Sequence, residues 1–169
     1  MENNRFDIII IGAGPAGIFA ALQITEKRPD SRVLIMDTGR AISHRTCPAR
    51  QNGQCLHCDP CAIVHGWAGA GAFSDGKLSL SDEVGGHVSD YIGHKRAMEY
   101  IRHADEQYLR FGASKTVHGL NNSRVDEIAY EASRHNIHLV PCPVRHLGTE
   151  NAGPVLGAMH DYLVNQTNT

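Results

Sequence analysis

Two short apolar runs flank an amphipathic segment near the start of the chain. Residues 6–11 and 32–37 are rich in Ile, Leu and Val, and near-continuous runs of this kind are typical of strands buried on both faces of a parallel sheet. Between them, buried-type residues recur at three- and four-residue spacing: Ile18, Ala21, Leu22 and Thr25. This spacing predicts a helix, which Pro15 can begin and Pro29 ends. The pattern therefore predicts a βαβ unit with two parallel strands.

The segment from Thr38 to Lys77 has no hydrophobic periodicity and is rich in Cys, His and Gly. A stretch of this length without elements of its own is usually a functional loop. Helical spacing then predicts three further helices, one ending near Gly112, one beginning at Ser123 and one capped by Asn151.

A short strand is also predicted at residues 138–140, where His-Leu-Val precedes two prolines. The best candidate for a domain boundary is the Gly85-Gly86 pair. It divides the chain into residues 1–84, a dinucleotide-binding unit with Cys-rich and Gly-rich loops, and residues 85–169, a mostly helical continuation that begins an insert or a substrate-facing region.

Composition narrows the function classes. The 169 residues suffice for one domain but are few for separate cofactor and substrate domains. With 16 Lys and Arg against 18 Asp and Glu, the net charge of -2 provides no positive field for nucleic acid. The longest apolar stretch, Ile8 to Leu22, is interrupted by glycines, is too short for a bilayer and lacks signal-peptide features. We expect a cytoplasmic protein without a membrane span or a nucleic-acid partner.

The turn after the first predicted strand carries a G-x-G-x-x-G pattern. It consists of Gly12, Gly14 and Gly17, with Pro15 and Ala16 before the last glycine. In a dinucleotide site, the first glycine makes the tight turn, the second admits a pyrophosphate and the third lets helix and strand pack closely. The pyrophosphate would lie at the positive end of the helix dipole. A glycine-rich turn without a ligand is the alternative.

An acidic residue stands where this site would need one. Asp37 ends the second predicted strand, 20 residues after Gly17, and would accept hydrogen bonds from the ribose hydroxyls of the adenosine. A carboxylate also repels a 2′-phosphate, which favours FAD or NAD over NADP. Thr38, Gly39 and Arg40 complete the turn, and Arg40 keeps NADP(H) open.

A second glycine-rich segment spans residues 66–77. Its small residues suit close packing of the backbone against a flat ligand such as a flavin. Its candidate cofactor-binding residues are Gly69, Ala70, Gly71, Ser74, Asp75, Gly76 and Lys77. Ser74 and nearby amides would bind the pyrophosphate or the flavin edge, and Lys77 would stabilise charge on a reduced flavin. A surface turn at Asp75-Gly76 is an equally good interpretation.

Four cysteines lie within 15 residues. Cys55, Cys58 and Cys61 form a C-x-x-C-x-x-C pattern, and Cys47 lies eight residues upstream of Cys55. Four thiolates held together could bind an iron–sulfur cluster or a zinc ion. A redox-active C-x-x-C pair is a second interpretation, and plain reduced thiols are a third.

Several of these segments together resemble the N-terminal part of the uncharacterised FAD-dependent dehydrogenase family, within the glutathione-reductase-like flavoproteins. They are residues 10–17, 34–40, 47–48, 58–61, 68–78, 83–86 and 145–149. The resemblance implies FAD as cofactor, NAD(P)H as a candidate electron donor, and a redox role with no defined substrate. It places Gly12, Gly14 and Gly17 at the pyrophosphate, Asp37 at the ribose and residues 69–77 near the flavin.

Proteins of this family continue into further sheet strands and a substrate-facing domain. We therefore expect an α/β, Rossmann-like FAD- or NAD(P)-binding domain with an incomplete parallel sheet, which a C-terminal region or a second copy completes. The expected function is that of an FAD-dependent oxidoreductase, with catalytic residues and small-molecule substrate unassigned. The alternatives are an NAD-binding oxidoreductase and a non-catalytic nucleotide- or metal-binding fragment.

Overall fold

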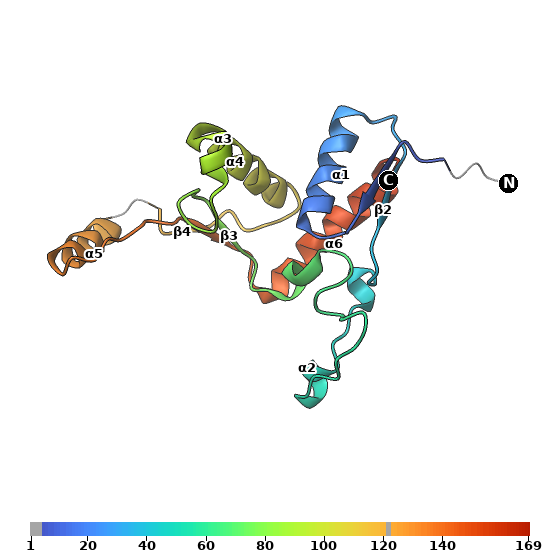
Figure 1. Cartoon of the computed structure of the whole chain (residues 1–169), viewed down its shortest axis with the longest axis horizontal. Coiled ribbons are helices and arrows are strands. Elements are labelled where there is room, and N and C mark those ends of the chain that lie inside the picture. Colours follow the sequence, from blue (N-terminus) through green and yellow to red (C-terminus); the bar gives the residue numbers. More distant parts are fainter. Residues whose placement is uncertain (1–4, 121–122) are drawn as a thin grey trace. The chain divides into compact units, whose positions relative to one another are not determined.

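The computed structural model describes residues 5–120 and 123–169 of a mixed α/β protein (Figure 1). Its contacts divide the chain into a first unit, residues up to Gly76 with Thr149–Thr169, and a second unit, Lys77–Gly148. This division differs from a boundary at Gly85-Gly86. The reason is that the last helix, α6 (Thr149–Gln166), packs with α1 and residues 69–73 of the first unit, and local sequence patterns do not report such long-range contacts.

The predicted βαβ unit is present. Strand β1 (Ile8–Ile11) pairs in parallel with β2 (Val33–Met36), with Ile8 opposite Val33. Helix α1 (Pro15–Lys27) joins them. Its buried residues are those of the predicted stripe: Ile18, Ala21, Leu22 and Thr25.

The strands are not buried on both faces, contrary to the sequence prediction. Ile9 is 56% exposed and Ile11 is 88% exposed, whereas alternate residues of β1 are partly covered. In the described residues this sheet has two strands. With so few strands and one connecting helix, only part of the apolar surface can be covered.

The core of the first unit is shared between the βαβ unit and α6. The largest fully buried side chains are Ile18, Leu22, Val33, Met159 and Leu163. Beyond α6, the Val33 amide donates to the Asn168 carbonyl at 2.8 Å, so the tail runs beside β2. Helix α6 begins two residues before the predicted cap, Asn151.

The long segment after β2 has only short elements, as expected. They are η1 (Ile42–His44), α2 (Ala49–Asn52) and η2 (Gly69–Phe73). The rest of this segment is irregular, and its shape depends on hydrogen bonds to side chains described below. None of these pieces is long enough to be stable by itself.

The second unit contains a small antiparallel sheet with the order β3 (Lys77–Ser79), β5 (Val144–His146), β4 (Val117–His118). Its helices are α3 (Val88–Ile92), α4 (His94–Arg110) and α5 (Ser123–Arg134). The strand predicted at 138–140 is wrong. A strand needs backbone partners, and those offered by β3 and β4 lie opposite residues 144–146.

Across the described ranges, none of the helices is both long enough and apolar enough to cross a bilayer. The most amphipathic of them, α4 and α5, carry charged residues along one side. In α4 the buried residues are Ala97 and Gln107, and α5 has none.

Candidate functional site

The glycine-rich turn shows why two of its glycines differ in role. Gly12 has a φ of +103°, and its amide donates to the Met36 carbonyl at 2.7 Å. A Cβ on Gly17 would lie 2.0 Å from the Gly12 carbonyl oxygen, so packing alone requires glycine there. A Cβ on Gly14 would meet no atom of the described residues within 4 Å. The fold therefore requires Gly17, whereas the space in front of Gly14 is open.

This open space lies at the N-terminus of α1. Gly14 is the N-cap residue, and no side chain in the described part of the chain caps the helix. The first hydrogen bond of the helix joins the Ile18 amide to the Gly14 carbonyl at 3.0 Å. The first amides of an α-helix have no acceptor within the helix, and those of Ala16 and Gly17 are in this position. They lie at the end of the helix that favours negative charge.

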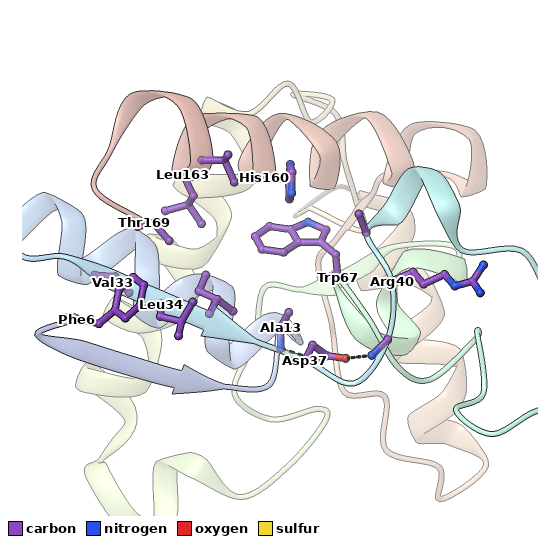
Figure 2. A pocket seen from close by; sticks show the side chains of 14 residues that line it. Phe6, Ala13, Val33, Leu34, Asp37, Arg40, Trp67, His160, Leu163 and Thr169 are labelled. Carbon is purple, nitrogen blue, oxygen red and sulfur yellow. Dashed lines mark hydrogen bonds between the residues drawn. The ribbon is translucent and has the colours of Figure 1, made fainter. Parts of the chain in front are cut away.

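Asp37 connects three segments of the chain (Figure 2). Its carboxylate accepts hydrogen bonds from the backbone amides of Ala13, Gly39 and Gly66 at 2.9, 2.8 and 2.7 Å. Partial burial alone would raise the pKa of Asp37, but these three donors and nearby His65 together lower it below its usual value. The residue remains exposed to solvent.

The second glycine-rich segment packs directly on the first. The Ala68 amide donates to the Ala13 carbonyl at 2.7 Å. A Cβ on Gly69 would lie 3.6 Å from the Gly14 Cα, so η2 begins beside the N-terminus of α1. The structure thus brings together the two glycine-rich segments that were predicted from the sequence to contact one cofactor.

The turn after β2 meets the second segment equally closely. A Cβ on Gly39 would lie 2.2 Å from the Gly66 nitrogen, and one on Gly66 would lie 2.4 Å from the Arg40 carbonyl oxygen. Both positions therefore need glycine for backbone packing. Thr38 is exposed in the same turn. Arg40 lines two separate cavities, one of which is described below.

Arg45 is a site residue that the sequence analysis missed. Its guanidinium is enclosed by main-chain carbonyls, those of Ala62 at 3.0 Å, Ile63 at 2.7 Å, Trp67 at 2.5 Å and Gly69 at 2.9 Å. Arg45 is 6% exposed, and burial lowers its pKa despite the opposing charge of Asp37. No sequence motif marks this role, because its partners are backbone groups.

The Arg45 guanidinium lies over the ring of Phe73, the last residue of η2. The Arg45 guanidinium carbon lies 4.7 Å from the ring centroid, and the Arg50 one lies 4.6 Å from it. Arg45 thus fixes both ends of residues 62–73. This arrangement holds the second glycine-rich segment against the first. It also places the positive charge of Arg45 next to the second segment.

A cavity of about 510 Å³ opens beside Asp37, between β2 and α6 (Figure 2). Its walls are mostly apolar, and its size lies in the range of small-molecule sites. Trp67 borders it, with the indole N–H donating to the Leu156 carbonyl at 2.8 Å. The Trp67 ring meets the His160 ring edge-on, with centroids 5.0 Å apart.

The end of the second segment forms a turn. The Ser74 hydroxyl donates to the Gly71 carbonyl at 3.0 Å and accepts from the Gly76 amide at 3.1 Å. These bonds match the surface-turn interpretation and occupy the Ser74 hydroxyl locally. Lys77 is exposed and is the first residue of β3, in the second unit. Ala70 is exposed on η2.

The cysteines are free thiols. Cys55 and Cys58 are exposed, whereas Cys47 and Cys61 are half-buried. Among the described residues, no three His, Cys, Asp or Glu side chains gather closely enough to hold a metal ion. The metal site at Cys47, Cys55, Cys58 and Cys61 therefore stays a prediction.

Together these segments offer free amides at a helix end, an exposed carboxylate, a buried cation and an apolar cavity. This set of groups could bind a ligand with a phosphate portion, hydroxyls and a flat apolar portion. Neither a family model nor a curated protein matches the chain.

Proposed function

We propose that the first unit binds FAD and is the cofactor-binding part of a flavin-dependent oxidoreductase, built on the first βαβ unit of a Rossmann-like domain. The observation that carries this proposal is the contrast between Gly17 and Gly14. Packing against the Gly12 carbonyl accounts for Gly17, whereas no atom of residues 5–120 or 123–169 lies within 4 Å of a Cβ placed on Gly14. A ligand at the N-terminus of α1 gives that glycine a reason.

The pyrophosphate of FAD would bind the uncapped amides of α1. Gly14 would let it approach the backbone, and Pro15 and Ala16 would form the first turn behind it. The start of η2 lies close enough to border the same ligand, since a Cβ on Gly69 would be 3.6 Å from the Gly14 Cα. Gly71 is the next glycine along η2, and a Cβ there would approach the Pro15 ring at 4.0 Å.

Asp37 would bind the adenosine ribose. A carboxylate has about four acceptor positions, and three backbone amides use part of them. Because Asp37 is exposed, hydroxyl groups can still reach it. The adjoining cavity of about 510 Å³ would take the adenine, and its apolar walls suit a flat heterocycle.

When bound, the flavin supplies the redox chemistry. The residues of this chain contribute binding and electrostatics: Arg45 holds a positive charge under η2 at a fixed position, ready to stabilise negative charge on a ligand nearby. The same proposal includes NAD(P)H as the candidate electron donor and a substrate that the flavin oxidises or reduces.

Trp67 provides the test, because it is the single tryptophan and lines the cavity. Titration with FAD should quench its fluorescence and give a saturable binding curve. NAD⁺ and NADP⁺ are titrated in parallel. Tighter binding of NAD⁺ than of FAD would favour the NAD-binding alternative, and no response to any of them would overturn the proposal.

A pair of glycine variants distinguishes ligand binding from folding. Gly14→Ala should weaken FAD binding by about tenfold or more, because the methyl group fills the pyrophosphate space. Gly153→Ala is the matched control, since its Cβ also meets nothing within 4 Å but lies in α6. Equal FAD affinities for the two variants would contradict the assignment of Gly14.

A further inference from the structure

Helix α5 carries an apolar face that the described residues cover only partly. Its apolar residues recur at three- and four-residue spacing and therefore share one side of the helix: Val125, Ile128, Ala129 and Ala132. None of the described residues of α5 is buried, and Ile128 is 43% exposed. A helix of 12 residues gains little stability from its own hydrogen bonds. A partner that covers this face would therefore stabilise α5.

An open hollow of about 340 Å³ lies along the same helix, in the second unit. Its lining residues are Ile128 and Ala132, the charged Arg124, Glu127 and Glu131, and His135, which directly follows the helix. The surface of the hollow is mostly apolar. Within residues 5–120 and 123–169, everything that lines it comes from this one helix and its C-terminal end. The hollow is thus a surface on which another chain can pack.

The charges beside the apolar face are arranged so that the helix complements itself. Arg124 and Glu131 are seven residues apart, which is close to two helical turns, so both flank the apolar face on the same side. When two copies of α5 pack antiparallel through their apolar faces, this flank of one helix meets the same flank of the other. Arg124 of one copy then lies opposite Glu131 of the second copy, and two-fold symmetry forms the pair twice.

A parallel arrangement of the two helices does not pair these charges. It brings the flank of Arg124 and Glu131 against the opposite flank of the second copy, where α5 carries Asp126 and Ser133. Neither of these residues offers a positive charge to Glu131. The order of charges therefore favours an antiparallel pair, and the complementary set is already present on this helix, so a second copy of the chain fits it.

The contacts that these charged residues make within α5 leave room for a second partner. A terminal nitrogen of Arg124 lies 3.0 Å from Glu127 Oε2, and one of Arg134 lies 3.4 Å from Glu131 Oε2. All four side chains are more than half exposed, and exposed pairs of this kind contribute at most about 1 kcal/mol. A guanidinium has several donors and a carboxylate several acceptor positions. Arg124 and Glu131 can therefore keep their neighbours and also pair with the second copy.

We propose that α5 is a self-association surface, through which two copies of the chain form an antiparallel, two-fold symmetric dimer. Ile128 lies next to the midpoint between Arg124 and Glu131 in the sequence, so the two Ile128 side chains meet near the two-fold axis. Two ion pairs between Arg124 and Glu131 border them. The interface is small, so the dimer is weak and forms at high chain concentration. It lies in the second unit and is independent of the proposed FAD site.

Sedimentation equilibrium of the full chain tests the dimer, over concentrations from about 5 to about 500 μM. The mean mass should rise from that of a monomer toward that of a dimer. Ile128→Asp should weaken dimerisation by about tenfold or more, because it places a charge near the axis. Tyr130→Asp is the matched control, since it adds the same charge to α5 on the side away from the apolar face. A monomer at every concentration, or equal effects of the two variants, would overturn the proposal.

Charge reversal tests the antiparallel arrangement. Arg124→Glu leaves acidic groups opposite each other in the dimer, and Glu131→Arg leaves basic groups opposite each other. Each variant alone should dimerise about tenfold more weakly or worse. An equimolar mixture of the two should restore association, because the acidic flank of one variant then meets the basic flank of the other.

Arg134→Gln is the control for the contacts within α5, because it removes the intrahelical partner of Glu131 on the side away from the apolar face. Its dimerisation constant should stay within about twofold of wild type, and circular dichroism checks that every variant keeps its helix content. Failure of the mixture to associate more tightly than either variant alone would contradict the antiparallel pairing. None of these readouts depends on a flavin.

Discussion

The Asp37 carboxylate accepts a hydrogen bond from the Gly66 amide at 2.7 Å, across 29 residues of sequence. The same carboxylate accepts from Ala13 and Gly39, so it joins the glycine-rich turn, the end of β2 and the second glycine-rich segment. One side chain thus holds the three parts of the candidate site in register. A ribose-binding residue that is already fixed in this way loses little side-chain entropy when a ligand binds.

Asp37→Asn should lower stability in a pH-dependent way. Three backbone donors and His65 keep the pKa of Asp37 below its usual value, although burial opposes them. A carboxylate with a lowered folded-state pKa stabilises the protein above its unfolded pKa of about 3.9 and loses that contribution as pH falls through the folded value. We expect a difference of about 1–2 kcal/mol from wild type at pH 7, discounted for the exposure of Asp37.

Urea unfolding at pH 7, 5 and 3 measures this difference. It should be constant between pH 7 and pH 5 and should shrink at pH 3. Asp30→Asn is the control, because Asp30 is exposed in the turn after α1. A difference between Asp37→Asn and wild type that persists unchanged at pH 3 would show that the charge of Asp37 is not responsible.

Gly17→Ala should destabilise the first unit much more than Gly14→Ala. The new Cβ at residue 17 would lie 2.0 Å from the Gly12 carbonyl oxygen. This oxygen belongs to the backbone and the Cβ is bonded directly to the helix backbone, so neither can move away cheaply. We expect a loss of about 3 kcal/mol for Gly17→Ala and about 1 kcal/mol or less for Gly14→Ala, where only the helix-capping preference changes. Thermal unfolding followed by Trp67 fluorescence measures both, and equal losses would contradict the packing argument.

Local pattern was sufficient for the βαβ unit. The spacing of Ile18 and Leu22 and the apolar runs of β1 and β2 are properties of neighbouring residues, and they predicted the helix, its buried side and the parallel pair. The exposed Ile11 shows the limit of that inference, because burial depends on how many elements cover a strand. The hydrophobic pattern of a strand does not show how many other elements cover it.

Arg45 and the strand at β5 show why the rest was not predicted. The acceptors of Arg45 are carbonyls up to 24 residues away, and every residue has a carbonyl, so composition carries no signal. Residues 138–140 have an apolar character suited to a strand, but pairing with β3 and β4 placed the strand at Val144–His146. In both cases the deciding partner is distant in sequence.

Arg45→Met should loosen residues 61–73, whereas Arg50→Met should not. Both guanidinium groups lie over Phe73, but only Arg45 is buried, with four main-chain acceptors. Its removal leaves these carbonyls without their donor, and we expect a loss of about 3 kcal/mol or more. Arg50 is exposed, and its loss should change stability by about 0.5 kcal/mol or less.

Urea unfolding and limited proteolysis report on the two arginine variants. Arg45→Met should become sensitive to cleavage in the segment between Cys61 and Phe73, and Arg50→Met should match wild type. If both variants are equally stable and equally resistant, the carbonyl contacts of Arg45 do not hold this segment.

In the second unit, a partly buried ion pair joins β5 to α4. The Arg145 Nε and a terminal nitrogen donate to the Asp105 carboxylate, the latter at 2.8 Å, and another terminal nitrogen donates to the Ser114 carbonyl at 2.5 Å. The side chains of Arg145 and Asp105 are 5% and 16% exposed, and the hydrogen bonds that Arg145 donates to Asp105 raise the pKa of Arg145 despite burial. Asp105→Leu should therefore cost about 3–5 kcal/mol, because it leaves a buried guanidinium without its partner.

The double variant Asp105→Leu/Arg145→Met should recover much of this loss, because apolar side chains can fill a buried pair's space without an unpaired charge. A double-mutant cycle by urea unfolding gives the coupling energy of the pair. The exposed pair of Arg124 and Glu127, 3.0 Å apart on α5, is the control and should show coupling of about 0.5 kcal/mol or less. Similar coupling in both cycles would mean that burial adds nothing to the Arg145–Asp105 interaction, and that other contacts hold β5 to α4.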